Sequence, residues 1–255
     1  GQSRYTTARK EGDLVEILSG VFEGKTTGTP ISLIVRNTDQ RSRDYGNIAY
    51  TYRPGHADFT FDAKYGFRDY RGGGRSSGRE TIGRVAAGAI AAKILETLEI
   101  SFYTYTKSIG PVKIESFDAE EISKNAFYMP DAKAAEAAGA YLEECMKNQD
   151  SAGGIIECRI KNVPAGLGNP VFEKLDAVLA EAVMSIGAVK AVEIGDGIQV
   201  SAMKGSEDND GFHMENGQIT KNSNHAGGIM GGMSDGSEII LRAAVKPTPS
   251  ISQPQ

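Results

Sequence analysis

The chain has 255 residues, of which 40% are hydrophobic and 24% charged, and this composition excludes a disordered or fibrous protein. A net charge of −5 argues against a general nucleic-acid partner, and no apolar run approaches the roughly 20 residues that a membrane span needs. Two cysteines and three histidines favour a reducing, cytoplasmic setting without a disulfide framework or a zinc site.

The N-terminal region is predicted to form strands over 15–18 and 31–35, separated by glycine turns. An arginine-rich segment follows. Between Arg36 and Arg84 the chain has ten Lys or Arg, nine of them arginine, against six Asp or Glu. Because the planar fork of an arginine suits phosphates and carboxylates, this segment predicts a small anionic ligand. Ordinary surface charge is the alternative.

A turn is expected at Pro54-Gly55, which places Arg53 and His56 on a loop. A loop histidine between an arginine and an aspartate could donate a proton near neutral pH. The alternative is an exposed histidine without a chemical role, and the same alternative applies to His213 and His225.

Three glycines, 72–74, precede a helix that is predicted over 81–98. Ser77 and Glu80 have the spacing of a capping box, so the helix should begin at Ser77 with free backbone N–H groups facing outward. Full positive charges are supplied nearby by Arg71, Arg75 and Arg79. The segment therefore predicts an anion site, although it is not a Walker A loop. A flexible glycine loop before an ordinary helix is the alternative.

The second half is predicted to mix strands and helices. Strands are expected over 101–106 and 155–160, and a helix over 132–147 should begin after Asp131 as its N-cap. A further helix is expected over 170–186, with Asn169 as its N-cap and Gly187 just beyond its end. A hairpin is then expected between 189–194 and 197–202, turned at Gly195-Asp196-Gly197.

Two distant segments, 19–31 and 227–239, resemble each other. Each has three glycines at a spacing of four, and an apolar strand follows each block. We interpret this as internal duplication about a pseudo-twofold axis, with halves of about 1–110 and 111–255. The alternative is two unrelated glycine turns. Antiparallel sheets packed on helices, an α+β fold, are expected. Two prolines stiffen 246–250, whose N–H groups and hydroxyls could line a pocket or simply end a strand.

Several of these motifs together resemble the chorismate synthase family. The matching segments are 3–7, 18–24, 37–42, 53–58, 65–77, 163–168, 192–197, 224–228 and 246–248. They cover nearly the whole chain in the family's order. The resemblance implies a single domain over 1–255, a β-α-β sandwich of antiparallel sheets around helices, and assembly as a homotetramer.

The resemblance also implies the reaction, in which 5-enolpyruvylshikimate 3-phosphate loses phosphate by 1,4-elimination to give chorismate. Reduced FMN is required without net oxidation, and whether NADPH reduces it on the protein is left open. The cofactor residues implied are Arg75, Ser76, Ser77, Gly187, Ala188, Gly231, Lys246, Pro247, Thr248, Pro249 and Ser250. The residues implied for the substrate's anionic groups are Arg4, Arg53 and Arg79, and His56 is implied near the flavin as a proton donor.

The sequence departs from the family's pattern at both ends. It starts at Gly1 without an initiator Met, and it lacks the family's Gly-Glu-Ser-His-Gly and Arg-His-Asp motifs. Losing a positioned general acid costs on the order of 10² to 10⁴ in rate, so we expect a trimmed chain with little activity and weak FMN binding. The alternatives are a non-catalytic flavin- or phosphate-binding module and a phosphate-binding transferase of another family.

Overall fold

The computed structural model describes residues 3–6, 12–37, 48–71 and 77–255. Contacts between Cα atoms separate two units, Gly1–Ile94 with Gln255 and Leu95–Pro254. This boundary lies at Ile94, whereas the predicted halves meet near residue 110. The prediction of one domain with two similar halves stays a prediction.

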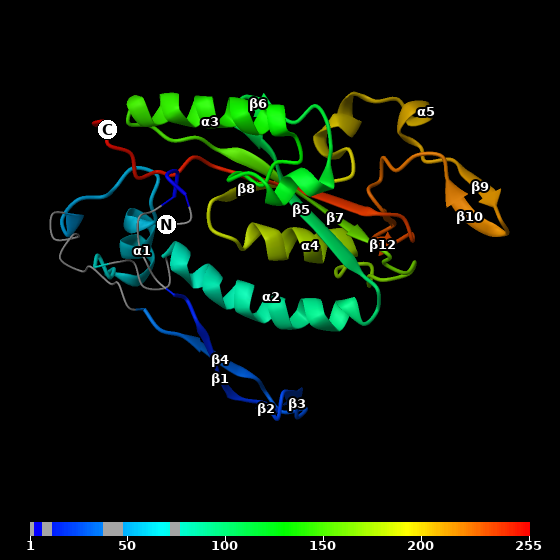
Figure 1. Ribbon diagram of the computed structural model, residues 1–255, viewed down its shortest axis with the longest axis horizontal. Coiled ribbons are helices and arrows are strands. Elements are labelled where there is room, and N and C mark those ends of the chain that lie inside the picture. Colours follow the sequence, from blue (N-terminus) through cyan, green and yellow to red (C-terminus); the bar gives the residue numbers. More distant parts are fainter. Residues whose placement is uncertain (1–2, 7–11, 38–47, 72–76) are drawn as a thin grey trace. The chain divides into compact units, whose positions relative to one another are not determined.

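The first unit contains two small antiparallel ladders and two α-helices (Figure 1). Its elements are β1 (Val15–Ser19), β2 (Val21–Phe22), β3 (Lys25–Thr26), β4 (Ser32–Val35), α1 (Asp58–Tyr65), the 3₁₀ turn η3 (Gly78–Glu80) and α2 (Thr81–Glu96), whose last two residues belong to the second unit. Strand β1 pairs with β4, and β2 with β3. The strands expected over 15–18 and 31–35 and the helix expected over 81–98 are confirmed within two residues.

The second unit is built on a five-stranded sheet with the order β6-β5-β7-β13-β8. The strands of this unit, including two separate hairpins β9–β10 and β11–β12, are β5 (Ser101–Ile109), β6 (Val112–Lys113), β7 (Gly154–Lys161), β8 (Val189–Ile194), β9 (Phe212–Glu215), β10 (Gln218–Lys221), β11 (Ile229–Met230), β12 (Met233–Ser234) and β13 (Ile239–Val245). Its helical elements are η4 (Ala119–Ser123), α3 (Ala132–Lys147), α4 (Leu175–Met184), η5 (Gly197–Ala202) and α5 (Gly205–Asp208). Every strand pair in the described residues is antiparallel, so the expected α+β class is confirmed.

Two apolar clusters hold this unit together. In the first, buried Ile160, Ile239 and Leu241 of the central strands contact Leu175 and Leu179 of α4. In the second, Met129 and three alanines at the start of α3 pack against apolar residues around β6. Both α3 and α4 therefore cover the sheet through apolar contacts (Figure 1). Among the described residues, no helix has the length and apolar character to cross a membrane.

Asp131 explains the start of α3 and part of the sheet's edge. One carboxylate oxygen accepts hydrogen bonds from the backbone N–H groups of Lys133 and Ala134, as an N-cap does. The other accepts from the N–H groups of Glu115 and Ser116, at 2.9 and 3.0 Å. These bonds hold the pKa of Asp131 well below its ordinary value. The predicted helix over 132–147 is confirmed with its cap.

The predicted hairpin over 189–202 is wrong in its second arm. Strand β8 forms as expected, but residues 197–202 form η5, and the partner of β8 is β13. The turn itself is bound elsewhere, because Gly195 N–H donates to the carbonyl of Ile240 and Asp196 N–H to that of His225. Strand β8 thus pairs with β13, which is distant in the sequence, and not with the adjacent residues 197–202 that the turn predicted.

The helix predicted over 170–186 is shorter than expected. Its first residue is Leu175, and Asn169 is not its N-cap. Asn169 and Glu173 instead exchange both backbone N–H···O bonds, which makes a tight turn before the helix. At the other end, Ala188 rather than Gly187 has the left-handed backbone, with φ of 71°.

The two segments predicted to be repeats share a conformation. Each forms a short hairpin, β2–β3 or β11–β12, followed by a strand. Gly20 and Gly228 have φ of 81° and 80°, and their carbonyls accept from Thr27 N–H and Asp235 N–H at 3.0 Å in both cases. A Cβ on either glycine would lie 2.7 Å from a backbone carbonyl oxygen just before the following strand, that of Pro30 or that of Glu238. Only glycine fits these two positions.

A row of polar side chains crosses one face of the five-stranded sheet. The register sets Glu157 of β7 opposite both Tyr105 of β5 and Arg242 of β13, and Arg242 opposite Glu193 of β8. The Glu157 carboxylate is buried and accepts hydrogen bonds from Tyr105, from Lys107 and, at 2.6 Å, from Arg242 Nε. Burial alone would raise its pKa, but these donors outweigh that effect and lower the pKa to about 2.

We predict that Glu157→Gln lowers the free energy of unfolding by about 3 kcal/mol at pH 7, because it leaves the partly buried cations of Lys107 and Arg242 without their buried carboxylate. Glu193→Gln, in the same row but more exposed, should cost less than about 1 kcal/mol. Because folding lowers the pKa of Glu157, its contribution is complete above the unfolded value near 4.3 and is lost as the pH falls toward 2. Urea unfolding at pH 7 and pH 3 tests this. Equal losses in both variants, or a loss independent of pH, would contradict it.

Candidate functional site

The turn from Arg53 to Asp58 is held by hydrogen bonds between its own residues. Gly55 has φ of 70°, and His56 N–H donates to the carbonyl of Arg53 at 3.2 Å. Helix α1 begins at Asp58, directly after the turn. The expectation that Arg53 and His56 stand on a loop is confirmed.

The carboxylate of Asp58 holds the side chain of Arg53 in place. Its Nε and Nη2 donate to the two oxygens of Asp58 at 2.9 and 2.8 Å, and its backbone N–H donates at 3.0 Å. Asp58 is only 7% exposed, whereas the Arg53 side chain is 30% exposed. The hydrogen bonds from Arg53 lower the pKa of Asp58 to about 2, so the pair is charged at all physiological pH values.

The imidazole of His56 has a defined proton position. Its Nδ1 lies 3.0 Å from the carbonyl oxygen of Pro54, which can only accept. Nδ1 therefore carries a proton, and Nε2 is the atom at which neutral His56 can take up another. His56 is half-buried, so this ring is neither sealed in the core nor fully in water.

The start of the α2 region follows the predicted cap. Ser77 Oγ accepts from Arg79 N–H at 3.3 Å, whereas the carboxylate of Glu80 pairs with Arg84 and does not close a capping box. Arg79 donates from Nη2 to Asp13 at 3.0 Å. The glycines 72–74 and two predicted cofactor residues, Arg75 and Ser76, lie outside the described residues.

Arg4 is exposed at the surface of the first unit. Its Nη2 donates to the hydroxyl of Tyr5 at 2.6 Å, and the guanidinium lies 4.8 Å from the centre of the same ring. A cation over an aromatic face is attracted to it. This contact fixes the guanidinium against its neighbour in the chain.

The second unit brings most of its predicted cofactor residues together. Lys246 N–H donates to the carbonyl of Ala188 at 2.9 Å, which joins the end of β13 to the turn before β8. The hydroxyl of Ser151 donates to the carbonyl of Thr248 at 2.7 Å and fixes the proline-containing segment. Gly187, Ala188 and 246–250 thus form one cluster.

Gly231 does not belong to this cluster. It lies in the β11–β12 turn, with φ of 59°, before the first residue of β13, whereas Lys246 follows the last. The carbonyl of its neighbour Gly232 accepts from Leu175 N–H at the start of α4, whereas Lys246 bonds to Ala188 beyond the end of that helix, and ten helical residues span about 15 Å. Within one chain the structure therefore does not bring Gly231 to Lys246.

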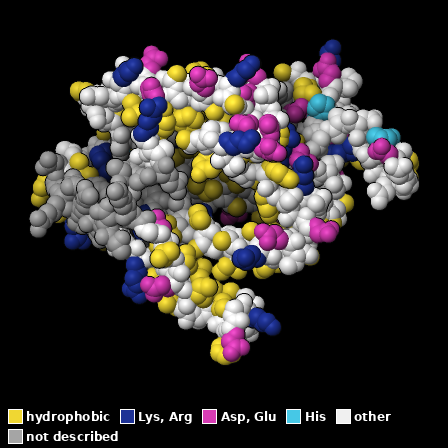
Figure 2. All heavy atoms as spheres, in the orientation of Figure 1, with side chains coloured by type: hydrophobic (Ala, Val, Ile, Leu, Met, Phe, Trp, Pro, Cys, Tyr) yellow, Lys and Arg dark blue, Asp and Glu magenta, His cyan; other side chains and the backbone are white. Residues whose placement is uncertain are grey.

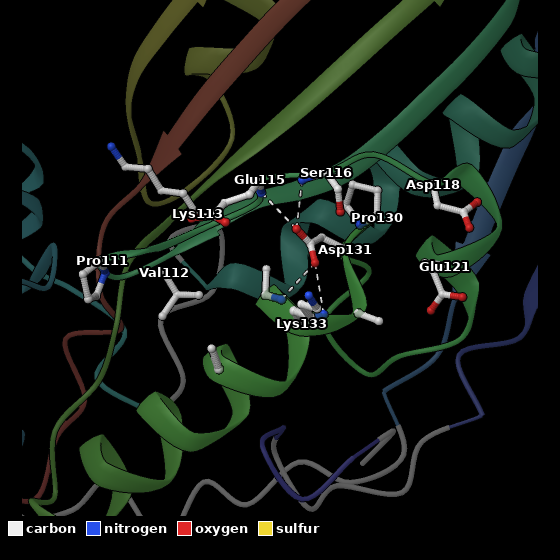
Figure 3. A pocket seen from close by; sticks show the side chains of 13 residues that line it. Pro111, Val112, Lys113, Glu115, Ser116, Asp118, Glu121, Pro130, Asp131 and Lys133 are labelled. Carbon is white, nitrogen blue, oxygen red and sulfur yellow. Dashed lines mark hydrogen bonds between the residues drawn. The ribbon is translucent and has the colours of Figure 1, made fainter.

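A pocket of about 880 Å³ lies beside the start of α3 (Figure 3). Its charged lining residues are Lys113, Glu115, Asp118, Glu121, Asp131 and Lys133. In Figure 3 the carboxylate of Asp131 points to backbone N–H groups rather than into open space. No described residue predicted to bind cofactor or substrate lines this pocket, and we assign it no role in the site.

Sequence reasoning missed the residues that hold the site in place. Asp58 bonds to Arg53 and Ser151 to the carbonyl of Thr248, Gly153 leaves room for Pro247, and Arg68 lies beside Asp58, and none of the four was assigned a role. For Asp58 a signal was present, because an acid and an arginine flank a Pro-Gly turn. Among the described residues no group of three or more His, Cys, Asp or Glu could hold a metal ion.

Comparison with known proteins gives one consistent result. The sequence model of chorismate synthase matches residues 1–255. The chain is 64% identical over 257 residues to a chorismate synthase of Agathobacter rectalis and 54% identical over 256 residues to one of Chloroflexus aurantiacus, and in each case it spans 70% of the relative. A crystal structure of chorismate synthase superposes with a TM-score of 0.79 at 33% identity, covering 92% of this chain and 70% of that one.

Gly153 is expected to be essential for the cluster around Lys246. A Cβ there would lie 2.7 Å from the Val245 carbonyl oxygen and 3.1 Å from Pro247 Cδ. Gly153→Ala should therefore lower the free energy of unfolding by about 1–3 kcal/mol, as overpacking does. Gly88→Ala in α2, where nothing lies within 4 Å, should raise it by up to about 1 kcal/mol. Urea unfolding measures both, and an unchanged Gly153→Ala protein would contradict the close approach.

Proposed function

The chain belongs to the chorismate synthase family, and from that membership we propose which of its residues carry the reaction. Chorismate synthase is a lyase of the shikimate pathway that acts on 5-enolpyruvylshikimate 3-phosphate with a flavin cofactor. The substrate loses phosphate and a proton in a 1,4-elimination that yields chorismate. The observation that carries our assignment is the Arg53–Asp58 turn, where a fixed guanidinium and a histidine of defined tautomer share six residues.

Reduced FMN is the flavin that we propose. The cluster around Lys246 fits its phosphate and ring system, since it combines a cation, two hydroxyl side chains and a left-handed turn at Ala188. The proposed holders are Ser77, Gly187, Ala188 and 246–250, together with Arg75 and Ser76 outside the described residues. When bound, reduced flavin supplies transient electron density while phosphate leaves, with no net oxidation.

Arginines are the proposed holders of the substrate, which carries a phosphate and two carboxylates. Arg53 suits this role because Asp58 fixes its plane while part of its side chain stays exposed. Arg4 and Arg79 are proposed for the remaining anionic groups. Fixed charges of this kind stabilise the developing negative charge on the leaving phosphate most strongly where water is excluded.

His56 is the proposed proton donor near the flavin. Its Nδ1–H is directed at the Pro54 carbonyl, so the proton that moves is held at Nε2. A protonated ring there also stabilises nearby negative charge. A non-catalytic flavin-binding module would have no use for a proton donor, which favours the enzyme over that alternative.

A homotetramer is the proposed assembly, and two observations support contact with further copies. Gly231 lies near the start of α4 and Lys246 beyond the end of that helix, so a flavin site that uses both takes them from different chains. Hydrophobic side chains also gather over the β1–β4 hairpin (Figure 2). The exposed members are Leu14, Val15, Ile17, Leu18 and Phe22. A two-stranded ladder with such a face is marginally stable until something covers it.

The composition supports the remaining proposals. A net charge of −5 and the absence of a candidate membrane-spanning helix from the described residues are consistent with a cytoplasmic enzyme that has neither a nucleic-acid nor a membrane partner. The expectation that the 255-residue chain alone has little activity stays a prediction.

Arg75→Ala should weaken FMN binding by about 1.5–3 kcal/mol, the scale of a hydrogen bond to a charged group. Quenching of flavin fluorescence, measured on the product of the complete reading frame, gives the dissociation constant. Arg36→Ala, which removes an exposed arginine paired only with Glu16 among the described residues, is the matched control and should change it less than about twofold. Equal affinities of the Arg75→Ala variant and the wild type would argue against the assignment.

The decisive assay for the function follows chorismate absorbance after dithionite-reduced FMN and the enolpyruvyl substrate are added to the same protein. His56→Ala should reduce turnover by about 10² to 10⁴, the usual contribution of a positioned acid or base, and change FMN affinity far less. His213→Ala is the control, since His213 is an exposed residue of β9. Equal losses of turnover and FMN affinity would make His56 a binding residue only, and no chorismate from the wild type would refute the function.

A further inference from the structure

Asp58 is a buried carboxylate that the proposed reaction does not use directly, yet three of its hydrogen bonds go to one proposed substrate residue. We propose that Asp58 is a positioning residue that fixes both the guanidinium of Arg53 and the turn that carries His56. This inference rests on the proposed function of those two side chains and assigns a role to a third.

Asp58 clamps Arg53 at two places, its guanidinium and its backbone N–H group. Asp58 Oδ2 accepts from Arg53 Nε at 2.9 Å and from Arg53 N–H at 3.0 Å, while Oδ1 accepts from Nη2 at 2.8 Å. Parallel bonds from Nε and Nη2 fix the plane of the guanidinium as well as its place. The bond to the backbone N–H closes the turn, because it ties its first residue to its last.

A second arginine holds the carboxylate in position. Arg68 is 10% exposed, and its Nε lies 3.8 Å from Asp58 Oδ1 without a hydrogen bond of its own. Its Nη1 donates to Asp62 at 2.5 Å and its Nη2 to the carbonyl of Thr51 at 2.9 Å. Asp58 therefore lies between two cations, one buried and one partly exposed.

This arrangement controls the direction in which Arg53 acts. The carboxylate occupies the edge formed by Nε and Nη2, while 30% of the Arg53 side chain stays exposed. An arginine without this clamp samples several rotamers and must be ordered when the substrate binds. Since misplacement by about 1 Å can cost about 100-fold in rate, a fixed guanidinium matters for the elimination as well as for binding.

The test uses the complete, flavin-loaded enzyme and four variants, Asp58→Asn, Asp58→Glu, Arg53→Ala and the double variant Asp58→Asn/Arg53→Ala. Asp58→Asn keeps the size of the side chain and should raise the KM for the substrate about 10- to 100-fold. The dissociation constant of FMN should change less than about threefold. Asp58→Glu keeps the charge at a shifted position and should give an intermediate KM.

The double variant separates positioning from an independent role. If Asp58 acts through Arg53, Asp58→Asn should add almost nothing to the KM of Arg53→Ala, because the group that it positions is gone. Additive losses would overturn the inference, as would a loss of FMN affinity as large as the rise in KM. If Asp58→Asn does not fold, Asp58→Glu alone decides, and an unchanged KM in that variant overturns the proposal.

Asp69→Asn is the matched control. Asp69 also accepts from the backbone N–H and the Nε of an arginine, Arg71 at 3.0 and 3.2 Å, but it is exposed. The KM of the Asp69→Asn variant for the substrate should stay within about twofold of the wild-type value. Failure of the two proposals can be told apart: an unchanged KM in Arg53→Ala refutes the role of Arg53, whereas a raised KM there with a normal KM in Asp58→Asn refutes only the inference about Asp58.

Discussion

Strand β13 is bonded on both sides, to β7 and to β8, and this double ladder decides which residues can meet at the candidate flavin site. Its last residue, Val245, lies opposite Gly154 and Val189. The residues that precede those two, Gly153 and Ala188, therefore come beside the segment that leaves the strand. The bond from Lys246 N–H to Ala188 and the close approach of Gly153 to Pro247 follow from this register. A slip by one residue would turn every side chain of β13 to the other face and separate the cluster.

Three buried carboxylates, Asp58, Asp131 and Glu157, show different ways of compensating a charge that is costly to bury. Asp131 uses backbone N–H groups, and Glu157 uses side-chain cations and a tyrosine. Asp58 combines both kinds of donor and takes most of them from Arg53. At Asp131 and Glu157 the compensation of the charge serves the fold alone. At Asp58 it also orients a side chain that the proposed reaction needs, so stability and function depend on the same bonds.

The sequence predicted those features that short-range chemistry decides. Asp131 before an alanine-rich run predicted α3 with its cap, and the ordered motifs identified the family across the whole chain. It could not predict features that depend on distant partners. The turn at Gly195–Gly197 gave no sign that β8 pairs with β13, and nothing local showed that Asn169 would bond to Glu173 instead of capping α4. Likewise, the burial of Asp58 and the distance between Gly231 and Lys246 are properties of the assembled fold.

The two glycine-rich hairpins show what a local sequence pattern determines and what it does not. Gly20 and Gly228 have the same backbone conformation and the same closing hydrogen bond, so each sequence block encodes its own hairpin. The strands that follow have different surroundings. Strand β13 is flanked by β7 and β8, whereas β4 has β1 as its one partner among the described residues, with apolar side chains exposed beside it. Because a two-stranded ladder gains little stability by itself, the first copy needs a covering surface that the second obtains from its own sheet. Another chain of the proposed homotetramer would provide that surface, and it would also bring a second Gly231 to the flavin site.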